Sequence, residues 1–135
     1  MGSPQMNFFD GKLIVEEDKA YASLGNHKIL LPEEAFKTVK DSKVANKEVT
    51  FGIRPEYLDD GEELIANNPQ EVVKGEVEVI ELMGSESYIY VKVDGIQLTV
   101  RVNGTTKLKV GDKADIHVDS KRIHVFDKET ELRVL

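Results

Sequence analysis

Residues 75–102 read GEVEVIELMGSESYIYVKVDGIQLTVRV, and this stretch decides the fold class. Apolar and polar residues alternate strictly from Ile96 to Asn103. Successive side chains of a strand point to opposite faces, so this pattern predicts a strand with one buried and one solvated face. Residues 88–93 alternate in the same way, and Asp94-Gly95 between the two segments favours a type I′ turn. We therefore predict a tight hairpin at the centre of the core.

The first part of the same stretch changes phase. Val77 and Val79 alternate with polar residues, whereas Ile80 and Leu82 continue the apolar pattern one residue out of step. A slip of one residue predicts a β-bulge or bend near Ile80, after which Ile80 and Leu82 face inward.

Shorter strand patterns fill most of the remaining chain. They lie at residues 6–17, 20–24, 27–31, 48–53, 114–118 and 123–125. Ser120-Lys121 is predicted to turn the last two strands into a hairpin, and Arg54-Pro55 is predicted to end the strand at 48–53, because proline cannot donate to a ladder. Pro32 and the two acids after it predict one short helix, and residues 64–69 read as a connector. About nine to ten short strands with frequent turn signals predict an all-β barrel or sandwich.

Composition narrows the classes of function. The chain of 135 residues fits one domain, and it has no apolar run close to the ~18–20 residues that a membrane span needs. The absence of cysteine excludes disulfides and thiolate metal sites. A net charge of −7 argues against a groove for a phosphate backbone, which requires a basic face.

Four segments resemble one known family. Residues 49–58, VTFGIRPEYL, are similar to the GIRPE signature of the C-terminal regulatory domain in ATPase subunits of sugar ABC importers, the MalK-like family. Residues 2–8, GSPQMNF, resemble the junction that joins this family's ATPase domain to the regulatory domain. Residues 77–91 and 122–130 resemble its central strand pair and its closing segment, and all four segments occur in family order.

The resemblance implies an OB-fold-like barrel of the TOBE type. Residues 1–5 would be the junction from a missing ATPase domain, and residues 6–135 a single regulatory domain. The implied partners are that ATPase domain, a second copy in a homodimer, regulatory proteins and, indirectly, the membrane permease subunits. ATP and Mg would be bound by the ATPase domain, and no cofactor is expected in this segment. The implied location is cytoplasmic, peripheral to the inner face of the cell membrane.

The sequence carries no machinery for ATP hydrolysis. A phosphate-binding loop requires GxxxxGK followed by Ser or Thr, and the only Gly-Lys pair, Gly11-Lys12, is followed by Leu13. Adjacent carboxylates such as Glu33-Glu34 suit a solvated surface rather than an acid/base pair. We therefore expect no catalytic residues.

Two groups of residues are candidate binding sites. The interface for the ATPase domain or a regulator is predicted at Asn7, Phe8, Gly52, Arg54, Pro55 and Glu56. The alternative for this corner is structural, with Arg54 paired to an acid and Glu56 capping the next turn. The loop Ser85, Glu86 and Ser87 is small and polar, which suits either a ligand loop of an OB barrel or a plain hairpin turn.

A metal site is a third possibility from the residues. If Ser120-Lys121 forms a two-residue hairpin, His117 and His124 stand directly opposite each other. With Asp115 or Asp119 they could then bind a divalent ion. The alternative is that both histidines are surface residues of strands.

Three functions follow from these observations. The leading one is a non-catalytic regulatory and dimerisation domain of a sugar importer ATP-binding subunit. The second is sensing of a small oxyanion or sugar phosphate, for which the side chains would be Ser85, Ser87, Thr105, Thr106 and Lys107. The third is oligonucleotide binding through Tyr88 and Tyr90 with Lys92 and Arg101 nearby, which the net charge of −7 disfavours.

Overall fold

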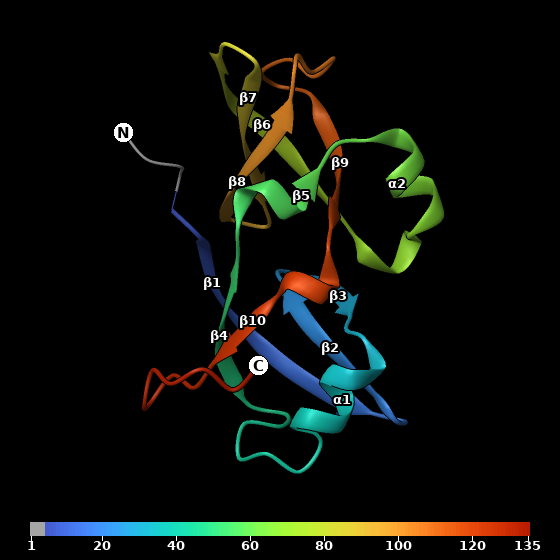
Figure 1. Ribbon diagram of the computed structural model, residues 1–135, viewed down its shortest axis with the longest axis vertical. Helices are drawn as coiled ribbons and strands as arrows, with labels where there is room; N and C mark the ends of the chain where they lie inside the picture. The colour runs from blue at the N-terminus through green and yellow to red at the C-terminus, as the bar shows by residue number, and fades with distance from the viewer. Residues whose placement is uncertain (1–4) are drawn as a thin grey trace.

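Ten strands and two short helices make up the fold of residues 5–135, the part of the chain that the computed structural model describes (Figure 1). The strands of the first sheet, in spatial order, are β10 (His124–Phe126), β4 (Glu48–Ile53), β1 (Asn7–Glu16), β2 (Lys19–Leu24) and β3 (His27–Leu30). Those of the second sheet are β5 (Leu58–Asp59), β9 (Lys113–Val118), β6 (Val72–Met83), β7 (Glu86–Val93) and β8 (Ile96–Asn103). The predicted all-β class and the number of strands are confirmed.

The two sheets follow each other along the long axis of the molecule, with the second sheet in the upper half of Figure 1. The chain leaves the first sheet after β4, through the 3-10 turn η1 (Pro55–Tyr57), and returns to it only at β10. The outer strands of the second sheet, β5 and β8, contact each other, so this sheet is nearly closed into a barrel. A buried aliphatic core continues through both sheets.

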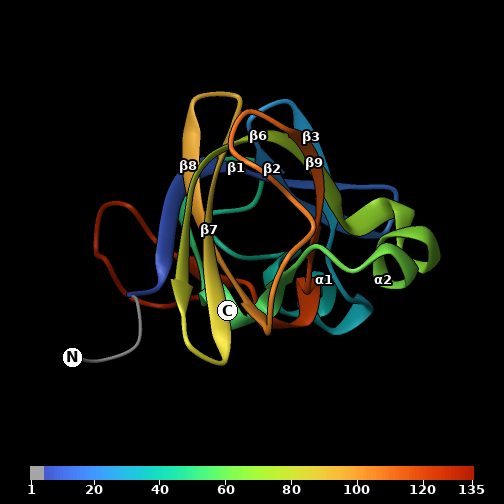
Figure 2. The same cartoon turned by 90° about the horizontal axis from the view of Figure 1, so that it is seen from above.

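The helices differ in part from the prediction. Helix α1 (Glu33–Val39) lies where one was expected, with Pro32 as its N-cap residue, and it buries Ala35 and Val39. A second helix, α2 (Glu62–Asn67), followed by the 3-10 turn η2 (Pro69–Glu71), occupies the predicted connector, so the prediction of a single helix was wrong. It buries no residue, which explains why no apolar periodicity revealed it, and it lies to one side of β9 (Figure 2). Within residues 5–135, neither helix has the length and apolarity needed to cross a membrane.

The central hairpin is confirmed. Val93 pairs with Ile96, and the turn residues Asp94 and Gly95 both have positive φ, at 48° and 86°. Positive φ at both central positions is the requirement of a type I′ turn. The inward-facing aliphatic side chains of β7 and β8 are largely buried: Ile89, Val91, Val93, Leu98, Val100 and Val102.

The phase change in β6 is also confirmed. The register against β7 shifts between Val77 and Val79, and Ile80 and Leu82 then lie opposite the buried residues Ile89 and Ser87. Both therefore belong to the inner face, as predicted. Leu82 is nevertheless 70% exposed. Strand β9 pairs with β6 only at residues 72–76, and beyond that point Ile80 is still half-buried against the core.

The predicted hairpin around Ser120-Lys121 was wrong. A 3-10 turn, η3 (Ser120–Arg122), redirects the chain, with the Asp119 carboxylate accepting a hydrogen bond from the Lys121 N–H at 3.2 Å. Strand β9 stays in the second sheet, whereas β10 crosses to the first and pairs with β4 through Val125 and Phe51. Ser-Lys lacks the residues that adopt positive φ readily, which a two-residue hairpin turn requires.

Candidate interaction surfaces

An apolar corner forms where β1, β4 and β10 lie side by side. Phe8 pairs with Gly52 across β1 and β4, and the Phe8 ring meets the Phe126 ring edge-on at 5.9 Å between centroids. A Cβ atom at Gly52 would lie 2.7 Å from Met6 Sδ and 3.2 Å from carbons of both rings. Glycine thus leaves the space in which Met6, Phe8 and Phe126 gather. We call these three side chains the Phe8 patch, and Phe8 itself is 59% exposed.

The other predicted interface residues have different positions. Arg54 and Glu56 are exposed on the adjoining turn η1, and Pro55 is buried there. Among residues 5–135 Arg54 has no ion pair, so the predicted pairing with an acid is not formed. Arg54 and Glu56 therefore form a charged border beside β8, against which η1 packs. The junction at residues 1–5 falls almost wholly outside the described residues.

Asn7 points inward rather than toward a partner. Its side-chain Nδ2 donates to the Thr99 carbonyl at 2.9 Å, and its Oδ1 accepts from the Thr99 N–H at 2.8 Å. The residue is only 9% exposed. One amide thus satisfies both backbone groups of Thr99 on the outer edge of β8 and joins the two sheets.

A second connection between the sheets lies at the Asp94-Gly95 turn. Asp94 Oδ2 accepts from the Asn26 N–H at 2.9 Å and lies 3.3 Å from His27 Nδ1. The other ring nitrogen of His27 accepts from the Lys74 N–H at 3.2 Å. The β2–β3 turn is therefore fixed against both β6 and the β7–β8 turn.

The polar groups of the predicted ligand loop are engaged within the second sheet. Ser87 is buried and donates to the Gly104 carbonyl at 2.8 Å, and the Ser85 carbonyl accepts from the Gly104 N–H at 2.7 Å. Glu86 forms an ion pair with Arg101 at 2.8 Å. Of the residues suggested for an oxyanion, Thr106 also donates to Asp60, at 2.6 Å. The loop is thus a hairpin turn that these hydrogen bonds and this ion pair hold in place.

The two tyrosines proposed for base stacking are bound to carboxylates. Tyr88 donates to Glu86 at 2.9 Å, and Tyr90 donates to Glu81. Donation to a carboxylate, together with burial, raises the pKa of both phenols above the ordinary value of 10.0. Acids beside the rings repel a phosphate backbone, so this face is unsuited to nucleic acid.

The two candidate metal-binding histidines lie in different sheets. His117 is on β9 and buried, with Nε2 3.9 Å from Glu71 Oε1, whereas His124 is on β10 with its ring centroid 6.3 Å from that of Phe126. The proposed pairing required the hairpin that is not formed. The described part of the chain has no cluster of three His, Cys, Asp or Glu residues suited to a metal ion.

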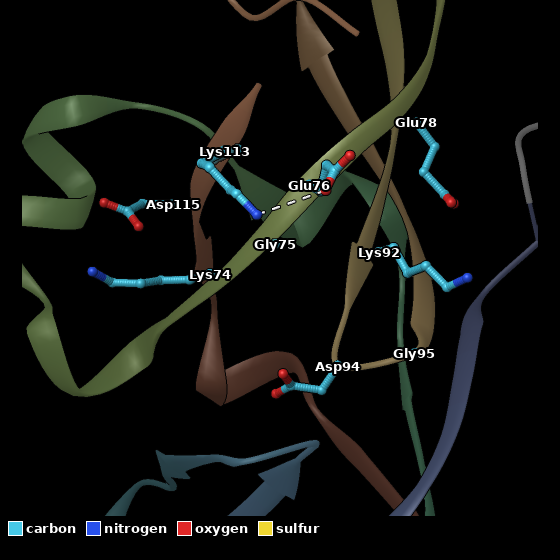
Figure 3. Close-up of a pocket in the computed structure, with 10 residues that line it drawn as sticks. Lys74, Gly75, Glu76, Glu78, Lys92, Asp94, Gly95, Lys113 and Asp115 are labelled. Carbon is cyan, nitrogen blue, oxygen red and sulfur yellow. Dashed lines mark ion pairs between the residues drawn. The ribbon is translucent and has the colours of Figure 1, made fainter. Parts of the chain in front are cut away.

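A charged groove of about 740 Å³ opens between β6, β9 and the β7–β8 turn. Its charged lining residues are Lys74, Glu76, Glu78, Lys92, Asp94, Lys113 and Asp115 (Figure 3). Lys113 forms an ion pair with Glu76 at 3.7 Å, and Lys92 points away from both Lys74 and Lys113 in Figure 3. The three lysine amines therefore do not converge in the groove.

Sequence reasoning missed Met6 and Phe126 as members of the apolar corner. Phe126 lies in RIHVFDKET, the segment that resembles the closing segment of the family, directly after residues 123–125, which were predicted to pair with residues 114–118. No local signal in the sequence showed that β10 pairs with β4 instead.

Two family models match the chain. The "MalK OB fold domain" matches residues 2–58, and the "TOBE domain" matches residues 51–126. Their overlap covers the end of β4, η1 and the start of β5, where the chain passes from the first sheet to the second.

Curated relatives are identical to this chain at about a third of the aligned positions. The chain is 34% identical to the oligosaccharides import ATP-binding protein MsmX of Bacillus subtilis, over 99% of this chain and 36% of that protein. It is 34% identical to the trehalose/maltose import ATP-binding protein MalK of Thermococcus litoralis, over 96% of this chain and 34% of that protein. The chain thus spans about a third of the length of these relatives.

A solved structure shares the fold. The cytoplasmic molybdate-binding protein ModG, with molybdate bound, superimposes with a TM-score of 0.59 at 20% sequence identity, over 87% of this chain and 92% of that one. At this identity the likeness concerns the fold alone.

Proposed function

The chain belongs to the TOBE domain family and carries a MalK OB fold domain, and on this premise we propose that it is a non-catalytic regulatory and dimerisation domain of a sugar importer ATP-binding subunit. Its partners would be the ATPase domain of the longer protein, a second copy, regulatory proteins and, indirectly, the permease subunits. ATP and Mg would be bound by the ATPase domain, on the cytoplasmic side of the membrane. The matched relatives, which are import ATP-binding proteins, support this proposal.

The observation that carries the proposal is the Phe8 patch. Exposed apolar surface bordered by charge is typical of protein contact sites, and the patch is bordered by Arg54 and Glu56 on η1. The side chains that form it come from β1, from β10 and from Met6 just before β1, and the absence of a side chain at Gly52 on β4 lets them gather. We propose that this corner contacts the ATPase domain or a regulator.

The connections between the sheets suggest how such a domain would act. Asn7 joins β1 to β8, and Asp94 joins the β7–β8 turn to the β2–β3 turn. A domain braced at both places moves as one body. It could therefore permit or block closure of two attached ATPase domains by its position alone, which is a steric form of allosteric control.

Dimerisation is tested by the solution mass of the chain, measured by light scattering over a concentration series. We expect a dimer at micromolar concentration. Phe8→Asp tests whether the Phe8 patch takes part, and Leu132→Asp, at an exposed residue of the C-terminal arm, is the matched control. A strict monomer at all concentrations would rule out autonomous dimerisation.

Docking to an ATPase domain is tested in a chimera. The present chain replaces the matching third of B. subtilis MsmX, and oligosaccharide-dependent growth is measured in cells that have only the chimera. We expect growth with the unaltered chain and with Leu132→Asp, and loss of growth with Phe8→Asp at normal chimera abundance. Equal growth with both variants would contradict the role of the Phe8 patch.

Small-ligand sensing is the alternative proposal. Its support is weaker, because the hydroxyl groups of Ser87 and Thr106 are engaged and the lysines of the charged groove diverge. Calorimetric titration with molybdate and with a sugar phosphate distinguishes the two proposals, since only ligand sensing requires saturable heat.

A further inference from the structure

We propose that the outer edge of β6 at residues 78–83, which we call the free β6 edge, binds an extended polypeptide segment rich in basic and apolar residues. The segment adds to the second sheet as a further strand beside β6. This inference goes beyond the regulatory role proposed above and does not depend on it.

The first observation is that the free β6 edge has no neighbour. Strand β9 pairs with β6 at residues 72–76, and the loop before β9 extends this contact to Val77, which bonds to Gly111 and Asp112 at 2.8 and 2.9 Å. From residue 78 to Met83, β6 pairs with β7 alone. Within residues 5–135, no backbone or side-chain group bonds to the other side of this segment. Its outward N–H and C=O groups are thus a ready template for another strand.

The second observation is that apolar side chains stand exposed along this edge on both faces of the sheet. Val79 and Met83 lie opposite Tyr90 and Glu86 and are 47% and 52% exposed. Leu82, on the inner face, is the most exposed of the three. An added strand would cover apolar surface on either face, and such surface on a free edge is otherwise a liability for aggregation.

The third observation is the sign of the charge. No basic residue occurs between Lys74 and Lys92, whereas four glutamates do: Glu76, Glu78, Glu81 and Glu86. Glu76 and Glu86 are paired with Lys113 and Arg101. Glu78 and Glu81 are exposed, and neither has a basic partner within residues 5–135. Charge complementarity therefore favours a basic segment.

The same charges argue against a second copy as the occupant. Two free β6 edges in antiparallel pairing would bring Glu78 and Glu81 of one copy beside those of the other. Like charges on neighbouring strands are destabilising, whereas lysine or arginine at the facing positions gains from both carboxylates. The occupant we infer is thus a basic and apolar strand of another polypeptide.

The probe is a blocked seven-residue peptide that alternates lysine and valine. It is titrated at low salt into the ¹⁵N-labelled chain, and amide shifts and amide hydrogen exchange are recorded. We expect shift changes centred on residues 78–83 and slower exchange there, with affinity falling as salt rises. A peptide that alternates glutamate and valine should not bind. The lysine peptide with every backbone amide N-methylated should also fail, because neither of its edges can then donate hydrogen bonds.

Charge variants sharpen the test. The double variant Glu78→Lys and Glu81→Lys should bind the lysine peptide on the order of tenfold more weakly and should gain binding to the glutamate peptide. The matched control is Glu48→Lys, which reverses an exposed acid on β4 of the first sheet and should leave binding unchanged.

Three results would overturn the proposal. One is the absence of shift changes at residues 78–83 at millimolar peptide. Another is shift changes centred on Lys113 and Asp115, which line the charged groove on β9 and do not belong to the free β6 edge. The third is exchange at residues 78–83 in the free protein that slows as protein concentration rises, since a second copy would then cover the edge.

Discussion

Strands β6 and β8 both pair with β7, but their outer edges differ in whether other parts of the protein bond to them. On β8, the side chain of Asn7 bonds to both backbone groups of Thr99 from a strand of the other sheet. On β6, no group of residues 5–135 covers the outer edge of residues 78–83 in this way. Both strands alternate apolar and polar residues, so alternation does not decide which edge is closed. At Thr99 the edge of β8 is capped by a side chain brought from 92 residues away in the sequence, and β5 and η1 also contact this strand.

The largest expected difference is between two leucines, one on each strand. Leu98→Ala in β8 should lower the free energy of unfolding by about 2–5 kcal/mol, because it opens a cavity in the closed core. Leu82→Ala in β6 should change it by less than about 0.5 kcal/mol, because that side chain is exposed. Urea denaturation of both variants measures this. Equal losses would mean that Leu82 is covered in solution.

The cap on β8 is tested by removing it. Asn7→Ala should cost about 1–3 kcal/mol, because it leaves the Thr99 N–H and C=O without partners in a poorly hydrated place. Asn7→Asp should also destabilise, since a carboxylate cannot donate to the Thr99 carbonyl. Asn103→Ala, at the exposed end of β8, is the matched control. Hydrogen exchange should accelerate most at the Thr99 amide in Asn7→Ala, whereas the carboxylate of Asn7→Asp still accepts from that N–H. An unchanged rate at Thr99 in Asn7→Ala would refute the capping role.

The two turns that flank β7 extend the comparison. Asp94→Ala should cost about 1–2 kcal/mol, because it removes the acceptor for Asn26 and places alanine at a φ of 48°. Asp94→Asn should cost less, since asparagine tolerates this φ and keeps an acceptor oxygen. Ser85→Ala, in the turn that leads from β6 to β7, should stay within about 0.5 kcal/mol. Thermal unfolding ranks the stability of the three variants. If Ser85→Ala lowers the free energy of unfolding as much as Asp94→Ala, the two turns do not differ in their contribution to stability.

The smallest effect concerns an alkaline titration beside the free β6 edge. The hydrogen bond to Glu81, together with burial, raises the pKa of Tyr90 above its ordinary value. The stability that this bond contributes is therefore complete below about pH 10 and is lost as pH rises through the raised pKa. Glu81→Ala should lower the pKa of Tyr90 toward 10.0, whereas Glu78→Ala should not. An NMR titration of the Tyr90 ring measures the shift, and the same pKa in the unaltered chain and in Glu81→Ala would contradict the assignment.

Local patterns were sufficient for much of this fold. The alternation before and after Asp94-Gly95 predicted the β7–β8 hairpin, and the phase slip predicted the bulge in β6, because both depend on residues close together in the chain. The pairing of β10 with β4 could not be predicted in this way, since its apolar residues fit a hairpin with β9 equally well. Helix α2 was not predicted, because it buries no residue and its sequence therefore shows no apolar periodicity.

The candidate surfaces show the same division. Phe8 and Gly52 were predicted from a segment resemblance, and the structure places them side by side. Phe126 joins them only through the long-range pairing of β10. Asn7 was predicted as an interface residue, and its bonds to Thr99 show an internal contact that no local pattern reveals. The exposure of Leu82 likewise does not follow from the local alternation, which places it on the inner face.

The late return of the chain to the first sheet has a consequence for synthesis. Of the ten strands described, β10 is synthesised after the other nine, yet it is the neighbour of β4, which is made much earlier. The edge of β4 that pairs with β10 therefore remains unpaired until the whole second sheet has been synthesised. The segment matched by the TOBE model thus supplies a strand to the sheet that begins in the OB segment. Cutting the gene between the two would leave the second sheet whole but deprive the first sheet of β10, so the OB segment alone cannot complete its sheet.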